Sequence, residues 1–566
     1  MTVIKVRFKR NFALVALHDF SSVKAVALRN ILNSRKHNQL RNSLIDELGD
    51  KFLNLAKSGS VPTVNNRYIL MEFFPLPLWA TVNAAVANLI SKKMGAAVFG
   101  FSFSTPARDG KQLFNSLGVS KFLIISQKIS KIPATFAMYR GVLKTLTDAN
   151  SVFEIRVDKV QIGVDIYESI LRRGKATVSI NDHETYIQIF RAIKQYIFFK
   201  DRFEKQEIVA VLLSHDNYIG PGLLSRMAYT YDVPVILANI FSITTPTQPF
   251  QLYSIFPRYR EYFSQIILQE QRDAIALSKA KLGKRLSGEL KIGMAYQEKS
   301  AFENSSVESQ LRVGTNLKVI ILTHDFYDNP HGYGRMLFDD FLLWLNFLGE
   351  LSSDTKYDWY IKTHRDFSDA ESIEVQKFVA RFPNIHLVNS ETSFLQLARE
   401  GIRFALTCYG TVGHELPLLG ITVINASYNP HVAYGFNHHA KSISHYEEMI
   451  RNLENYEIHK FDENEIYEFY YVHNNMLSRD DFILRSFEEL NRDCDGDFNS
   501  NFLIKHITSE LDSIICNVEL RAIELFNSHR VFSHESILPE DVQTKVPIST
   551  NNSAFYRAFD DGTVQP

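Results

Sequence analysis

The residues best suited to chemistry lie in one turn of the second half of the chain, after the apolar run Phe404–Cys408. The turn consists of Gly410, Thr411, Val412 and Gly413. Backbone N–H groups in such a turn can bind a phosphate when the positive end of a helix dipole lies behind them. Glu415, at the start of the following helix, would then be close enough to accept hydrogen bonds from a ribose. The segment therefore predicts a nucleotide site, and the simpler alternative is a tight turn that needs glycine geometry.

A second candidate group, His364 and Arg365, follows the apolar run Trp359–Thr363. Both side chains could neutralise the phosphate of a leaving group. A histidine at the end of a strand is often only structural, but the glycine turn in the same half of the chain favours a role in the site. We therefore predict that His364 is catalytic and that Arg365 binds phosphate together with the turn at 410–413.

The first half offers a carboxylate in a similar setting. Asp216 lies between the apolar run Ile208–Ser214 and a predicted helix. It is the leading candidate for a catalytic carboxylate, as base for an acceptor hydroxyl or as nucleophile, and helix capping is the alternative. Glu72, near the end of a strand, is a weaker candidate. Asp165 and Glu168 could also line the acceptor side, but their helical spacing favours an ion-paired surface face.

Metal-binding patterns are weak. Asp325, Asp328 and His331 share one loop, but their spacing matches no common metal site, and a turn capped by aspartates is the simpler interpretation. The adjacent histidines His438-His439 point apart and have no acidic partner at a suitable spacing. We therefore predict no metal and no resident cofactor.

The candidate residues follow apolar runs that alternate with helical patterns, as in parallel sheets buried on both faces. The predicted strands of the first half are Arg67–Phe73, Ala97–Phe103, Lys121–Ser126, Ile208–Ser214 and Val233–Asn239. Those of the second half are Lys318–Thr323, Trp359–Thr363, Ile385–Val388, Phe404–Cys408 and Thr422–Asn425. Ligands of such sheets bind beyond the carboxyl ends of the strands. The predicted fold class is α/β, with two Rossmann-like domains that face each other across a cleft and a helical C-terminal extension.

The predicted boundaries follow changes in composition. Residues 1–273 form an N-terminal Rossmann-like domain on the acceptor side, and residues 274–312, rich in Lys, Glu, Gln and Ser, form an exposed helix and linker. Residues 313–445 form the nucleotide-binding domain, 446–535 the helical extension and 536–566 an extended tail.

The bulk composition excludes several classes of protein. A length of 566 residues is too great for one core. With 62 basic and 63 acidic residues, nothing indicates binding to nucleic acid. The three cysteines show neither a metal-ligand nor a disulfide pattern, which fits a reducing compartment. We expect no secretory signal and no transmembrane helix, and we predict a cytoplasmic location.

The chain resembles GT-B glycosyltransferases of the bacterial capsule and surface-polysaccharide type, a group that includes Kdo transferases. The resemblance is clearest from 318 to 445, where Trp359–His364, Thr392–Glu400 and Cys408–Gly420 fall in the family's order. The family commonly has His-Pro after the second strand, whereas this chain has His364-Arg365. The resemblance implies a metal-independent transferase of the Leloir type, which moves a sugar from a CMP-, UDP- or GDP-sugar to a glycan acceptor in capsule or lipopolysaccharide synthesis.

The resemblance also sets the expected partners and the alternatives. The expected partners are a nucleotide sugar and a glycan acceptor. The protein could also be peripheral at the inner membrane or belong to a polysaccharide-assembly complex. A sugar-nucleotide epimerase or hydrolase could share the architecture and would form product without an acceptor. A non-catalytic component of the assembly complex would bind nucleotide without transfer.

Overall fold

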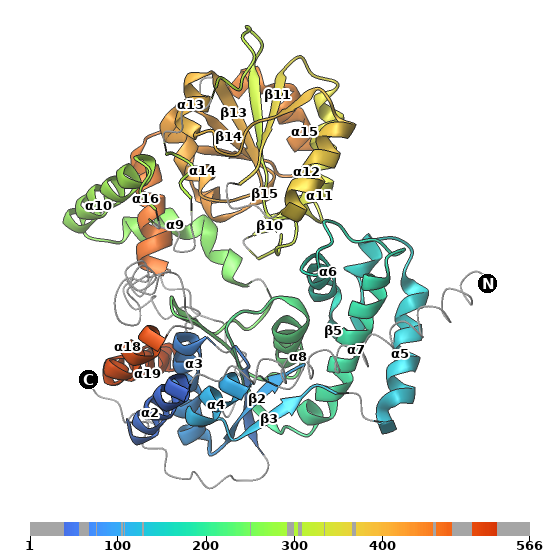
Figure 1. The fold of residues 1–566 in the computed structure, drawn as a ribbon, viewed down its shortest axis with the longest axis vertical. Helices are drawn as coiled ribbons and strands as arrows, with labels where there is room; N and C mark the ends of the chain where they lie inside the picture. Colours follow the sequence, from blue (N-terminus) through green and yellow to red (C-terminus); the bar gives the residue numbers. More distant parts are fainter. Residues whose placement is uncertain are drawn as a thin grey trace.

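The computed structural model describes residues 39–528, apart from 56–66, 75, 104–105, 107, 127–128, 250, 291, 293–298, 304–307, 333, 365–368, 457–459 and 478–500. Two six-stranded sheets, each in its own α/β domain, organise these residues (Figure 1). Among the described residues, no helix combines the length and the apolar composition that a membrane span needs. The predicted tail at 536–566 and Arg365 lie outside the described part of the chain.

The first sheet is parallel except for its last strand. Its spatial order is β3 (Lys121–Ile124), β2 (Ala97–Ser102), β1 (Tyr68–Glu72), β6 (Ile208–Leu213), β7 (Val235–Ala238) and β8 (Ile243–Thr244). Side chains that alternate along β1 enter different cores, because Ile69 packs on one face of the sheet and Leu70 on the other. The order reverses between β1 and β6, which is where ligands of open sheets bind.

All strands of the second sheet are parallel. Their order is β12 (Ile385–Leu387), β11 (Asp358–Lys362), β9 (Lys318–Leu322), β13 (Ile402–Thr407), β14 (Thr422–Asn425) and β16 (Asn437–His439). The reversal of order lies between β9 and β13. The predicted α/β class with two Rossmann-like domains is confirmed. The sixth strand, β16, was not predicted because its sequence, Asn-His-His, is polar.

Helices cover both faces of each sheet. Those of the first domain are α2 (Gln39–Leu55), α3 (Pro77–Met94), α4 (Arg108–Ser116), α5 (Ile132–Thr145), α6 (Gly163–Leu171), α7 (His183–Glu204) and α8 (Leu223–Thr230). Those of the second domain are α11 (Phe341–Ser352), α12 (Asp369–Arg381), α13 (Phe394–Arg399), α14 (Val412–Glu415) and α15 (Ile443–Arg451). The remaining helices are α9 (Tyr259–Ser264), α10 (Leu268–Leu286), α16 (Asn464–Tyr471), α18 (Asn501–Ser509) and α19 (Leu511–Ser528).

The helices of the predicted extension at 446–535 pack against other parts of the chain. Helix α16 packs against α10, while α18 and α19 lie against α2 and α3 of the first domain (Figure 1). Ile504, Ile514 and Val518 are buried in the same core as Ile69 of the first sheet. The apolar faces of α18 and α19 therefore complete a core whose other residues lie in the first half of the chain.

The two domains are joined by a buried carboxylate, Asp340, which caps the N-terminus of α11. Its Oδ1 accepts a hydrogen bond of 2.8 Å from the N–H of Leu343. Its Oδ2 accepts hydrogen bonds from the hydroxyls of Tyr167 (2.6 Å) and Thr177 (2.7 Å), which belong to the first domain. Burial raises the pKa of Asp340, and the hydroxyl donors oppose that shift.

Replacing Thr177 by valine should lower the free energy of unfolding by about 1–3 kcal/mol, because it removes one donor from a buried carboxylate. Adding Tyr167→Phe should cost more than the sum of the single changes, since Oδ2 of Asp340 then has neither hydroxyl donor. Chemical denaturation measures both effects. The control is Thr230→Val, whose hydroxyl only bonds the carbonyl of Arg226 within α8 and which should stay within about 0.5 kcal/mol. Equal small costs for Thr177→Val and Thr230→Val would contradict the role of Asp340.

Candidate functional site

His324 lies where the second sheet reverses its strand order. The N–H of Tyr409 donates to Nε2 of His324 (3.4 Å), which also lies 3.1 Å from Oγ1 of Thr407. The imidazole stacks on Phe341 with 5.1 Å between ring centroids. Burial lowers the pKa of His324 to about 4, so the ring is neutral at pH 7 and can accept a hydrogen bond. His324 therefore ties the end of β9 to the glycine turn after β13.

The glycine turn needs glycine at both ends. Gly410 has φ of 114°, and a Cβ there would lie 3.2 Å from Cε1 of His324. At Gly413 a Cβ would lie 2.6 Å from Cε1 of His431. The N–H groups of His414 and Glu415 bond the carbonyl of Thr411, at 3.1 Å each. The N–H groups of residues 410–412 precede the first turn of the helix, so the helix itself offers them no carbonyl acceptor. Residues 410–412 are half-buried.

Glu415 is less accessible than its predicted role requires. It is only 1% exposed, and its Oε1 forms an ion pair with Nε of Arg285, which is 4% exposed. The same guanidinium donates to the hydroxyl of Thr411 (3.2 Å) and to the carbonyl of Ile292 (3.0 Å). Ribose binding by Glu415 stays a prediction, and it would require the carboxylate to share or release Arg285. Helix α10, expected to be exposed, is thus anchored to the turn.

His364 and the turn belong to neighbouring strand ends. His364 follows β11 and is exposed, and its charge would lower the pKa of His324. β11 pairs with β9, which pairs with β13, so all three strands end at one edge of the sheet. Arg365, the predicted phosphate ligand beside His364, lies outside the described residues. The structure therefore brings His364, His324 and the turn to one edge of the sheet.

In the first domain the reversal point carries Glu72 and the loop after β6. Oε2 of Glu72 accepts hydrogen bonds from the N–H (2.8 Å) and the hydroxyl (2.7 Å) of Ser214. His215 follows, with Nδ1 at 2.9 Å from the hydroxyl oxygen of Ser214. Glu72, a weaker sequence candidate, thus lies in the centre of the reversal point.

Asp216, the predicted catalytic carboxylate, belongs to a cluster of acids around Arg226. Nε of Arg226 lies 2.6 Å from Oδ2 of Asp165, and both residues are buried. Burial raises the pKa of Asp165 to about 7 despite Arg226, and burial likewise raises the pKa of Asp216 and of Glu168. The expectation of a surface face for Asp165 and Glu168 is wrong, because they are 0% and 2% exposed. Carboxyl groups with raised pKa values are suited to proton transfer near neutral pH.

The carboxyl-end loops of the two sheets meet. The hydroxyl of Tyr218, after β6, donates to Oδ1 of Asp328 in the loop after β9 (3.1 Å). Nδ1 of His331 in that loop lies 3.3 Å from Oε1 of Glu168 on α6. The third residue considered for a metal, Asp325, instead accepts from the N–H of Tyr327 (2.7 Å). Among the described residues, no three His, Cys, Asp or Glu side chains are grouped as a metal site would require.

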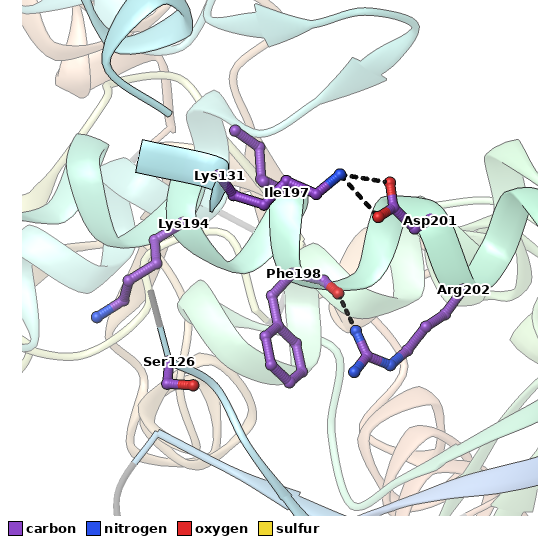
Figure 2. Close-up of a pocket in the computed structure, with 7 residues that line it drawn as sticks. All are labelled: Ser126, Lys131, Lys194, Ile197, Phe198, Asp201 and Arg202. Carbon is purple, nitrogen blue, oxygen red and sulfur yellow. Dashed lines mark hydrogen bonds and ion pairs between the residues drawn. The ribbon is translucent and has the colours of Figure 1, made fainter. Parts of the chain in front are cut away.

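A small pocket of about 20 Å³ lies elsewhere, between α7 and the loops around β3 (Figure 2). Its basic group Lys131 is paired with Asp201 at 2.7 Å. Arg202 donates to the carbonyl of Phe198, and its guanidinium lies 4.3 Å from the centre of that ring. This volume suits one or two waters and not a nucleotide.

Two residues of this site, His324 and Arg285, were not predicted from the sequence. His324 was part of a polar loop in which no role was given to it, and Arg285 lay in a segment whose many charges favoured an exposed helix. The position of His324 directly after a buried strand was a usable signal. The pairing of Arg285 with Glu415 spans 130 residues, so no local pattern could indicate it.

No model of a protein family matches the chain, and no curated protein matches it. Several solved structures show a distant likeness. KpsC of Thermosulfurimonas dismutans, a beta Kdo 2,4 transferase, is 13% identical with a TM-score of 0.28, and the match covers 47% of this chain and 80% of KpsC. A UDP-GlcNAc 2-epimerase from Neisseria meningitidis is 16% identical, with a TM-score of 0.22 and coverage of 72% and 98%. A glycosyltransferase from Rickettsia africae is 10% identical, with a TM-score of 0.24 and coverage of 77% and 100%.

Proposed function

We propose that this protein is a glycosyltransferase that moves a sugar from a nucleotide-activated donor to a glycan acceptor in bacterial surface polysaccharide synthesis. The observation that supports the proposal is the arrangement of the two reversal points. The second domain brings a glycine turn, His324 and His364 to one sheet edge, and the first brings Glu72 and the loop with Asp216 to another. The loops after β6 and β9 touch, so donor and acceptor groups would meet there.

The proposed roles follow from charge and geometry. The N–H groups at 410–412 and the side chains of His364 and Arg365 would stabilise the charge that develops on the leaving phosphate. His324 would hold the turn in place. The ion pair of Glu415 with Arg285 would stabilise the turn, and Glu415 would lie near the ribose. Asp216 would supply the carboxylate for the acceptor side. With cationic side chains and backbone amides on the phosphate, the transfer needs no metal.

A second candidate function is supported by the acid cluster. Asp165, Glu168 and Asp216 all have raised pKa values, and such groups would equally serve a sugar-nucleotide epimerase or hydrolase. The two functions differ in their need for an acceptor. Formation of free sugar or of an epimer from a nucleotide sugar alone would favour the second candidate.

Nucleotide binding is the direct test of the proposal. CMP, UDP or GDP, or one of their sugars, should raise the stability of the protein, by about 2.7 kcal/mol at a ligand concentration of 100 times Kd. Gly410→Ala should weaken that affinity about tenfold or more, because a side chain at φ of 114° beside His324 displaces the N–H groups. Thermal shift and calorimetry measure both quantities.

The matched control is Gly420→Ala. Gly420 also has positive φ, 73°, but a Cβ there meets nothing within 4 Å. Both variants should lose stability through backbone strain of about 1–2 kcal/mol, and only Gly410→Ala should lose nucleotide affinity. Equal affinity in both variants would argue against the turn as the phosphate site, and absence of binding by all nucleotides and their sugars would argue against the function itself.

A further inference from the structure

Glu72, Ser214 and His215 form a chain of hydrogen bonds that fixes the tautomer of the histidine. The hydroxyl of Ser214 has one hydrogen, and its oxygen lies 2.7 Å from Oε2 of Glu72, an acceptor when ionised. That hydrogen is therefore given to the carboxylate. The contact of 2.9 Å between the same hydroxyl oxygen and Nδ1 of His215 then needs a hydrogen from the imidazole. Nδ1 carries the proton, and Nε2 keeps its lone pair.

The ring of His215 is held at the exposed end of this chain. The side chain of His215 is 36% exposed, whereas that of Glu72 is 11% exposed. Phe74 and Tyr218 meet the imidazole edge-on, with ring centroids 6.4 Å and 6.2 Å away. Tyr218 has φ of 66°, an unusual conformation for an aromatic residue, which indicates a constrained loop at this position.

The location of this chain of hydrogen bonds points to a ligand. β1 ends at Glu72 and β6 ends just before Ser214, and the strand order of the first sheet reverses between these two strands. Open α/β sheets bind ligands in the crevice at this point. The next residue, Asp216, is a carboxyl group whose pKa is raised by burial, and the neighbouring Arg226 and His215 oppose that shift.

We propose that His215, in place of the neighbouring Asp216, is the general base of the transfer and that Ser214 and Glu72 are the residues that position it. This inference rests on the proposed function and deepens it. Nε2 takes the proton of the acceptor hydroxyl while the acceptor oxygen forms a bond to the anomeric carbon of the donor. The bond from that carbon to the phosphate oxygen breaks, and its electron pair leaves with the nucleotide. The imidazolium, which Glu72 holds through Ser214, then returns its proton to solvent.

Kinetics of the full chain test the role of His215. Nucleotide release from CMP-, UDP- and GDP-sugars, with a glycan acceptor mixture, should fall by about 10²–10⁴-fold in His215→Asn. Nucleotide affinity should stay within twofold, since the nucleotide binds the second domain. The matched control is His183→Asn, an exposed histidine at the start of α7, which should be unaffected. Wild-type turnover in His215→Asn would overturn the inference and leave the proposed function standing.

The positioning residues need a separate measurement. Ser214→Ala should shift the acidic limb of the pH–rate profile and lower turnover about tenfold or more, and Ser214→Thr should restore the profile because it keeps the hydroxyl. NMR of isotope-labelled histidine, assigned with His215→Asn, should show the Nδ1–H tautomer in the wild type and lose it in Ser214→Ala. An Nε2–H tautomer in the wild type would overturn the inference whatever the donor is. Absence of any nucleotide binding would instead overturn the proposed function together with this inference.

Discussion

Replacing Arg285 by methionine is expected to lower the free energy of unfolding by about 3–5 kcal/mol, because it leaves the carboxylate of Glu415 buried without its partner. The guanidinium also supplies hydrogen bonds to Thr411 and to the carbonyl of Ile292, which the methionine cannot replace. Urea denaturation measures the loss. The double variant Arg285→Met with Glu415→Leu should recover a large part of the stability, since it removes both charges together.

The control for this prediction is an exposed ion pair. Arg381 and Glu350 lie 3.2 Å apart, and their side chains are 58% and 68% exposed. Arg381→Met should cost less than about 1 kcal/mol. A cost for Arg285→Met as small as that of the control would contradict the role of the buried pair. The same argument bears on ribose binding by Glu415, because any variant there changes stability as well as affinity.

Mild acid is expected to destabilise the second domain strongly. Burial lowers the pKa of His324 and His439 to about 4, and it lowers the pKa of His414 and His431 well below 6.5. Above pH 6.5 these imidazoles are neutral in both states. Below it, the unfolded chain binds protons that the folded chain does not, so stability falls as the pH drops from 6.5 towards 4. The loss at pH 5 is about 2 kcal/mol for each of His324 and His439.

The three tryptophans make the measurement specific. Trp344 and Trp359 are buried in the second domain, and Trp79 is buried in the first. In a Trp79→Phe variant, fluorescence reports the second domain alone, and its urea midpoint should fall sharply between pH 7 and pH 5. Asp165, Glu168 and Asp216 of the first domain have raised pKa values and act in the opposite direction. Asp340 does the same in the second domain, where the histidines outnumber it. A second-domain midpoint that is equal at pH 7 and pH 5 would refute the prediction.

The sequence predicted the elements whose signal is local. The runs Lys318–Thr323 and Phe404–Cys408 are apolar because both faces of their sheet are covered, and they correspond to β9 and β13. The glycine turn could be recognised because it follows such a run directly. Strands with weaker patterns were missed, among them β16 and the short β10 (Arg335–Met336), because polar residues dominate the first of these and only two residues form the second.

The missed parts of the site depend on contacts between distant segments. The sequence analysis gave no role to His215, because the hydrogen bond between Ser214 and Glu72 joins residues 142 apart. The burial of Asp165 and Glu168 depends in the same way on Arg226 and on the loop with His331. Helical spacing alone predicted that Asp165 and Glu168 lie on an exposed face of the helix. Spacing within one helix does not show which of its faces is covered by other parts of the chain.

The packing of α18 and α19 against the first domain has a consequence for how the chain folds during its translation. The ribosome makes the strands of that domain early, but Ile504, Ile514 and Val518, which cover its apolar face, emerge only after the whole second domain. Domains usually fold in the order in which they are translated. In this protein, the domain that is translated second can finish folding first, and the nascent first domain exposes an apolar surface that chaperones would recognise until its last helices arrive.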